Sequence, residues 1–217
     1  MHKAIIVKEG YPFIIILFII TIIVAFTLSV YWSIIPALLT LFVTFFFRSP
    51  HRNIPQDQNL ILAPADGKVM GVTELENDDF VNDDFVNEPC KKVTIFLSVF
   101  DVHVNFSPMA GKIKFQEYTC GRFLAAYKDS VGFENERHSI GIENGDVKIL
   151  VTQIAGLIAR RIVSWVTLGN VLEPGQKYGL IKFGSCTEVT VPRDVEILVK
   201  KGDRVVGGET VIGRINR

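Results

Sequence analysis

The sequence predicts a mainly β (α+β) soluble domain of short antiparallel strands, preceded by an N-terminal transmembrane or re-entrant helical hairpin. The first observation is that residues 11–47 contain no charged side chain, which is typical of a membrane-embedded segment. The second is that the rest of the chain consists of short alternating apolar runs separated by turn residues. Together they divide the chain into a membrane anchor at residues 1–50 and a β-rich domain at residues 51–217.

Charge and cysteine content narrow the classes of function. The chain has 23 basic and 23 acidic residues, so its formal net charge of zero gives no electrostatic footprint for nucleic acid. Its three cysteines, Cys90, Cys120 and Cys186, are odd in number and lack the spacing of a zinc site. A disulfide framework is therefore not expected, and a reducing compartment is the simplest environment for the β-rich domain.

The apolar N-terminal segment is too long for one membrane span, because a helix of about 20 residues crosses the hydrocarbon core. We expect two helices, at residues 12–30 and 34–47, divided near Tyr31, Trp32 and Pro36. The second is short enough to be re-entrant rather than a full crossing. A cleaved signal peptide is the alternative, but its apolar region would be only about 7–15 residues long.

Basic residues stand at both ends of this apolar segment. Lys3 and Lys8 precede it, and Arg48 and Arg52 follow it. The positive-inside rule assigns both ends to the cytoplasmic side. We therefore expect the hairpin in the cell membrane and the β-rich domain in the cytoplasm.

The β-rich domain shows strand patterns along most of its length. An Asn-Gly pair at residues 144–145 indicates a tight hairpin between two of the strands. Residues 76–88 read as an acidic exposed loop, residues 123–128 as one or two helical turns, and residues 155–163 as either helix or strand. The expected strands are residues 60–63, 68–73, 93–100, 101–105, 113–118, 139–142, 147–153, 188–191, 196–199 and 210–215.

A Gly-Ser pair at Gly184 and Ser185 interrupts strand-forming residues on both sides. Taken alone, such a pair indicates a tight turn or bulge. Asp66, in a Pro-Ala-Asp-Gly turn, and His103, on the polar face of its strand, also have ordinary structural interpretations. Together, however, Ser185, His103 and Asp66 supply a nucleophile, a base and a carboxylate that orients the base.

Five separated motifs occur in order and are more specific in combination. Their pattern resembles the short, membrane-anchored form of the phosphatidylserine decarboxylase family, over nearly the whole chain. The motifs are Pro-Ala-Asp-Gly-Lys-Val at 64–69, Phe-Leu-Ser-Val-Phe-Asp-Val-His-Val-Asn at 96–105, Glu-Asn-Glu-Arg at 134–137, Ala-Gly-Leu-Ile-Ala-Arg-Arg-Ile at 155–162 and Lys-Phe-Gly-Ser at 182–185.

The resemblance implies a proenzyme that cuts itself between Gly184 and Ser185. His103, oriented by Asp66, would activate the Ser185 hydroxyl, and an ester and then a dehydroalanine would lead to a pyruvoyl group. The products would be a β chain of residues 1–184 and an α chain of residues 185–217. No metal is implied.

The resemblance also implies the reaction, which is decarboxylation of phosphatidylserine to phosphatidylethanolamine through a Schiff base with the pyruvoyl carbonyl. The carbonyl supplies the electron sink that ordinary side chains lack. Arg160 and Arg161 are candidates for binding the lipid phosphate or the substrate carboxylate, and a surface basic pair is the equal alternative. The membrane and a phospholipid are thus the expected partners; the oligomeric state is open, and a homodimer is one arrangement that the sequence allows.

Next to the serine the chain departs from the family pattern. Cys186 stands where Arg is frequent, Thr187 where an apolar β-branched residue is usual, and Glu188 where Asp is frequent. We interpret Cys186 as a packed thiol. The alternatives left open are a membrane-tethered serine hydrolase that uses the same three residues without self-cleavage, an unprocessed inactive relative, and a carrier module.

Overall fold

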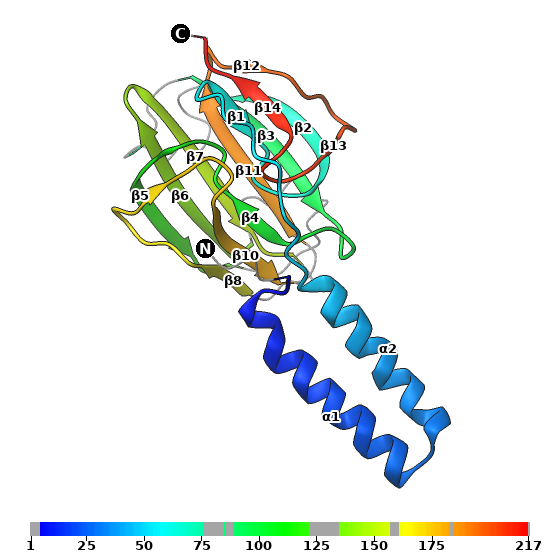
Figure 1. The fold of residues 1–217 in the computed structure, drawn as a ribbon. Coiled ribbons are helices and arrows are strands. Elements are labelled where there is room, and N and C mark those ends of the chain that lie inside the picture. Colours follow the sequence, from blue (N-terminus) through cyan, green and yellow to red (C-terminus); the bar gives the residue numbers. More distant parts are fainter. Residues whose placement is uncertain are drawn as a thin grey trace. The chain divides into compact units, whose positions relative to one another are not determined.

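The computed structural model describes residues 5–75, 85, 89–121, 135–156, 161–182 and 185–216. It divides into two units, Met1–His51 and Arg52–Arg217. Figure 1 shows that the first contains the helices and the second contains the strands. The prediction of a mainly β domain with an N-terminal helical hairpin is confirmed.

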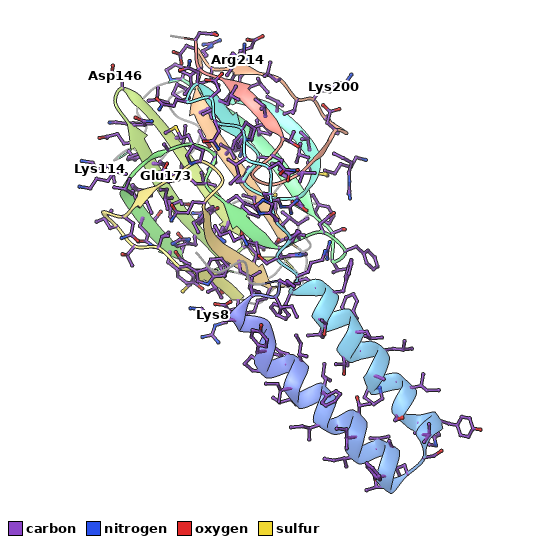
Figure 2. All side chains as sticks on the ribbon, in the orientation of Figure 1. Lys8, Lys114, Asp146, Glu173, Lys200 and Arg214 are labelled. Carbon is purple, nitrogen blue, oxygen red and sulfur yellow. The ribbon has the colours of Figure 1, made fainter. Side chains whose placement is uncertain are left out.

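The first unit is a helical hairpin. A short 3-10 helix, η1 (Lys8–Gly10), leads into α1 (Tyr11–Thr27), which is followed by α2 (Val30–Phe46). The helical stretch Lys8–Thr27 is long and apolar enough to cross a membrane, with a mean hydropathy of 2.5, and α2 is a shorter apolar helix. Side chains project outward along both helices, and most of their atoms are carbon (Figure 2).

The helices are divided earlier than the sequence indicated. Ser29 caps α2, and its hydroxyl accepts a hydrogen bond from the Tyr31 backbone N–H. Tyr31, Trp32 and Pro36 therefore lie inside α2, not at the break, and the expected start at residue 34 is wrong by four residues. The helix continues through Pro36, and the Thr40 hydroxyl donates a hydrogen bond to the Pro36 carbonyl.

The described residues of the second unit form three antiparallel sheets. The largest has eight strands in the order β13-β2-β3-β11-β7-β6-β5-β9, and Figure 1 shows that it curls. Its strands are β2 (Gly67–Leu75), β3 (Cys90–Leu97), β5 (Gly111–Thr119), β6 (Arg137–Asn144), β7 (Val147–Ile154), β9 (Val171–Leu172), β11 (Ser185–Pro192) and β13 (Arg204–Val205).

Two three-stranded sheets complete this unit. The order β4-β10-β8 joins β4 (Val104–Phe106), β10 (Lys177–Lys182) and β8 (Arg161–Ser164). The order β1-β14-β12 joins β1 (Leu60–Leu62), β14 (Val211–Arg214) and β12 (Glu196–Ile197). In Figure 1, β4 and β10 lie near the start of β11, whereas β14 lies near its end.

The hydrophobic core follows from alternation along the central strands. Val189 and Val191 of β11 are buried in the same cluster as Ile95 of β3 and Val151 of β7, each with an exposed fraction of 1% or less. The alternate residues of β11 face the other side of the sheet. One of them, Glu188, has a carboxylate oxygen 3.4 Å from the ammonium group of Lys92. This alternation decides which side chains of β11 enter the interior.

The strand predictions are confirmed in most places. The Asn-Gly hairpin joins β6 to β7, with Gly145 at a φ of 61° and Asp146 at the tip (Figure 2). The ambiguous segment at residues 155–163 contains the start of β8, while β9 and β13, which are two residues long, were not expected. The helical turns expected at residues 123–128 lie outside the described residues. So does the acidic loop at residues 76–88, apart from Phe85.

Candidate active site

Ser185 is the first residue of β11, and its side chain faces the interior. It pairs with Leu97 of β3, while its neighbour Cys186 pairs with Ile154 of β7. Because β11 alternates, Ser185 shares the inner face with Thr187 and Val189. The Ser185 side chain is fully buried, and its Oγ makes no hydrogen bond within the described part of the chain.

An unsatisfied buried hydroxyl is costly, at about 1–3 kcal/mol. Native proteins seldom retain such a group without a functional reason. The burial of Ser185 therefore favours a reactive role over a role as a turn residue. Ser185 itself is the first residue of a strand that is paired on both sides.

His103 is also fully buried, and it lies beside the strand that leads to Ser185. The Ile181 backbone N–H donates to the His103 carbonyl at 3.1 Å, which attaches this histidine to β10. Because β10 ends at Lys182, only residues 183 and 184 separate that strand from Ser185. His103 therefore lies beside the end of β10, just before the predicted cleavage point.

The imidazole of His103 is held by a backbone group. Its Nδ1 lies 3.0 Å from the Asp101 carbonyl oxygen. A carbonyl oxygen can only accept, so Nδ1 carries the proton of the neutral ring and Nε2 is the basic nitrogen. Asp101 is fixed in turn, because its carboxylate accepts from the Ser98 backbone N–H at 2.8 Å and from Arg204 at 2.9 Å.

Asp66 lies in a tight turn that approaches β3 closely. A Cβ at Gly67 would be 2.2 Å from the Phe96 carbonyl oxygen, so only glycine fits after Asp66. The Asp66 carboxylate accepts from Arg52 Nη2 at 2.8 and 2.9 Å and from the Gly207 backbone N–H at 2.8 Å. Within the described residues, therefore, the hydrogen bonds of Asp66 do not reach His103.

The ion pair between Arg52 and Asp66 is largely shielded from water. The exposed fraction of the side chain is 9% for Arg52 and 16% for Asp66. Arg52 also lies over the Phe106 ring at 5.3 Å, and its Nε is buried without a hydrogen-bond partner among the described residues. The sequence suggested only that Arg52 was part of a basic flank, whereas the structure makes it the partner of Asp66.

A network of buried polar side chains fills the space between β4 and the large sheet. Gln153 of β7 donates to Asn105 of β4 at 2.8 Å, and Asn105 donates to Thr187 of β11 at 3.2 Å. Gln153 also meets His138 of β6, with 3.0 Å between Gln153 Oε1 and His138 Nδ1. All four side chains have an exposed fraction of 4% or less.

Burial lowers the pKa of His138 below its usual value, and the hydrogen bond with Gln153 opposes this effect. The neutral ring fits the network, because Nδ1 donates to Gln153 and Nε2 accepts from Gln116 Nε2 at 2.9 Å. The sequence analysis missed His138 and Gln153. A polar residue at an inward position of an otherwise apolar strand is the signal that could have found Gln153.

Cys186 faces away from Ser185 on the opposite side of β11. It is buried, and burial together with the nearby Glu188 raises the pKa of its thiol. A raised thiol pKa removes the thiolate that a nucleophile needs. This agrees with the interpretation of Cys186 as a packed thiol.

The two arginines proposed for substrate binding are only partly described. Arg160 lies outside the described residues. Arg161 is exposed on β8 and pairs with Lys182, the last residue of β10. Arg161 is therefore near the chain segment that precedes Ser185. Within the described ranges, no group of three His, Cys, Asp or Glu residues is arranged to hold a metal ion.

The family model described as phosphatidylserine decarboxylase matches residues 39–213 of this chain. The phosphatidylserine decarboxylase proenzyme of Symbiobacterium thermophilum is 49% identical over 99% of this chain and 98% of its own length. The proenzyme of the same name from Carboxydothermus hydrogenoformans is 46% identical over 96% and 95%, and that from Syntrophus aciditrophicus is 44% identical over 98% of both.

The structure thus shows a buried Ser185 hydroxyl without a hydrogen-bond partner among the described residues and a buried His103 beside the strand that leads to it. The comparisons define the enzyme more closely. The chain belongs to the phosphatidylserine decarboxylase family, and it is a decarboxylase, a lyase of phospholipid biosynthesis.

Proposed function

We propose that this chain converts phosphatidylserine to phosphatidylethanolamine after cutting itself between Gly184 and Ser185. The observation that carries the proposal is the buried Ser185 hydroxyl, which has no hydrogen-bond partner among the described residues. The name proenzyme, which the relatives share, supports a processing step. The resulting chains are a β chain of residues 1–184 and an α chain of residues 185–217.

In the first step, His103 Nε2 takes the proton of the Ser185 hydroxyl, and Oγ attacks the Gly184 carbonyl carbon. The Gly184–Ser185 C–N bond breaks and the Ser185 nitrogen takes up a proton, which leaves an ester between the two residues. The basic Nε2 that follows from the Asp101 contact supports His103 in this role.

In the second step, the α proton of Ser185 is removed and the bond between its Cβ and Oγ breaks. The Gly184 carboxylate leaves as the new end of the β chain, and residue 185 becomes a dehydroalanine. Water then replaces the amino group, releasing ammonia and leaving a pyruvoyl group at the start of the α chain. The burial of Ser185 in the uncut chain supports this path, because limited access of water slows hydrolysis of the ester before elimination.

Residue 185 fits the requirements of a built-in carbonyl group. It begins a strand that is paired on both sides, so a group formed there has a fixed position after cleavage. A pyruvoyl carbonyl supplies an electron sink for the negative charge left by decarboxylation. We propose that His103, on the neighbouring segment, then returns a proton to the α carbon of the product.

The proposed substrate agrees with the anchor. Phosphatidylserine stays in the bilayer, and the apolar helices hold the β-rich domain at the membrane surface. We propose that Arg160 or Arg161 binds an anionic group of the substrate. Asp66 stays a proposed member of the processing site, although the described contacts of its carboxylate are with Arg52 and Gly207.

Intact-mass measurement under denaturing conditions tests the proposal, with a Ser185→Ala variant alongside. We expect two chains split after residue 184, with the small chain lighter than its serine sequence by one ammonia. The variant should stay whole. A small chain with an N-terminal serine would indicate simple hydrolysis, and an uncut wild type would favour the membrane-tethered serine hydrolase or the inactive relative.

A further inference from the structure

Asn105 has the most connected side chain of the buried polar network. Its Nδ2 donates to Thr187 Oγ1 at 3.2 Å and, more weakly, to the Pro64 carbonyl at 3.5 Å, and its Oδ1 accepts from Gln153 Nε2 at 2.8 Å. The side chain is fully buried. One amide therefore joins four segments, namely its own strand β4, the turn before β2, β7 and β11.

The segments joined in this way carry the three proposed catalytic residues. Asn105 is two residues after His103, and its partner Thr187 is two residues after Ser185. Its partner Pro64 is two residues before Asp66. Residues two apart in a strand lie on the same face, so Thr187 lies directly behind Ser185 on the inner side of β11.

We infer that Asn105 is the positioning residue of the processing site. Through Thr187 and Pro64 it holds the segments that carry Ser185, His103 and Asp66 in fixed positions relative to one another. The inference rests on the proposed self-cleavage. Asn105 does not act on the reacting atoms. Its amide fixes the distance between β4 and β11, which come from different sheets and share no backbone pairing among the described strands.

The orientation of the Asn105 amide is set by the rest of the network. Gln116 donates to His138, His138 donates to Gln153, and Gln153 donates to Asn105. Gln153 Oε1 accepts from the imidazole, so its Nε2 is the group that faces Asn105. Asn105 must then present its oxygen to Gln153 and its two N–H groups to Thr187 and Pro64.

Stability alone does not require this arrangement. Leucine is similar in size to asparagine, and replacing both partners of a buried hydrogen bond by apolar groups of the same shape can be nearly neutral or stabilising. A satisfied polar network instead favours one unique arrangement of the strands. For a reaction that needs Oγ within bonding reach of a carbonyl carbon, small displacements are costly in rate.

The test separates positioning from stability by using three variants. Asn105→Leu removes all the amide contacts. The triple variant Asn105→Leu, Gln153→Leu, His138→Phe also removes the Gln153 amide, which would lose its acceptor, and the His138 ring, which would lose Gln153. Ser139→Ala is the matched control, because Ser139 bonds Thr152 at 2.9 Å on the opposite face of the same strands, β6 and β7. The thermal midpoint of each variant is measured in a Ser185→Ala background, where no cleavage occurs.

Processing of the full chain is then followed by mass and by gel after synthesis at 25 °C. We expect Asn105→Leu to slow cleavage by at least tenfold, and we expect the triple variant to regain thermal stability while cleavage stays equally slow. Ser139→Ala should cleave at the wild-type rate. This pattern would assign the amide to positioning.

Two results would overturn the inference. One is cleavage of Asn105→Leu at the wild-type rate, and the other is recovery of cleavage together with stability in the triple variant. Failure of the wild type itself to cleave would instead refute the proposed function, so the two outcomes are distinct.

Discussion

At the scale of single residues, the partner of Asp66 is the main departure from what the resemblance implied. We predict that Asp66→Asn and Arg52→Met each destabilise the chain by roughly 3 kcal/mol, because each leaves a mostly buried charge without its partner. The double variant should lose less than the sum of the two. Urea unfolding in the Ser185→Ala background measures this coupling.

The same variants examine the proposed catalytic role of Asp66. If Asp66 acts on the reaction as well as on Arg52, cleavage in the wild-type background should be slower in Asp66→Asn than in Arg52→Met. Equal slowing in both variants would assign Asp66 to the ion pair alone.

His138 gives a prediction for pH. Its pKa is lowered in the folded chain, so below the usual pKa of about 6.5 the unfolded state binds a proton that the folded state does not. Stability should therefore fall as pH decreases from 7.5 to 5.5. In the Ser185→Ala background, His138→Gln should show a smaller decrease over this range in urea unfolding, and an unchanged pH dependence would contradict the assignment.

At the scale of elements, β10 approaches the large sheet closely at Gly179. A Cβ there would lie 2.6 Å from the Val163 carbonyl oxygen and 3.0 Å from Gln153 Nε2. We predict that Gly179→Ala destabilises the chain by about 1–3 kcal/mol through overpacking and that it also slows cleavage, because it displaces Gln153.

Gly71→Ala is the matched control for this element. Gly71 lies within β2, and a Cβ there meets no atom within 4 Å. Its unfolding midpoint should be unchanged or slightly higher. Equal losses in both variants would show that β10 has no special sensitivity to the added methyl group.

At the scale of the whole molecule, the sequence predicts on which side of the membrane the β-rich domain lies. Lys3, Lys8, Arg48 and Arg52 flank the apolar hairpin and favour a cytoplasmic position for the β-rich domain. We predict that a protease degrades this domain in inverted membrane vesicles but not in intact spheroplasts. Degradation from the outside, with a cytoplasmic marker protein still protected, would contradict the predicted orientation.

Local sequence patterns predicted much of this organisation. Apolar length identified the helices, alternation identified the long strands, and the Asn-Gly pair identified the β6–β7 hairpin, because each depends on residues close in the chain. Helix boundaries were less accurate, since the capping hydroxyl of Ser29, rather than Pro36, decides where α2 begins. The two-residue strands β9 and β13 carry too short a pattern to be recognised.

The sequence by itself determined the apolar helical hairpin and the β class of the domain, and it identified the Gly184–Ser185 pair as the candidate cleavage site, because composition, period and motif are local properties. Only the tertiary structure decided that Ser185 is buried, that Arg52 and Gly207 hold Asp66, and that Asn105 reaches Thr187. Asp66 and Gly207 are 141 residues apart, and Asn105 and Thr187 are 82 apart. Such contacts follow from how the sheets pack together, so the pattern of any single strand does not contain them.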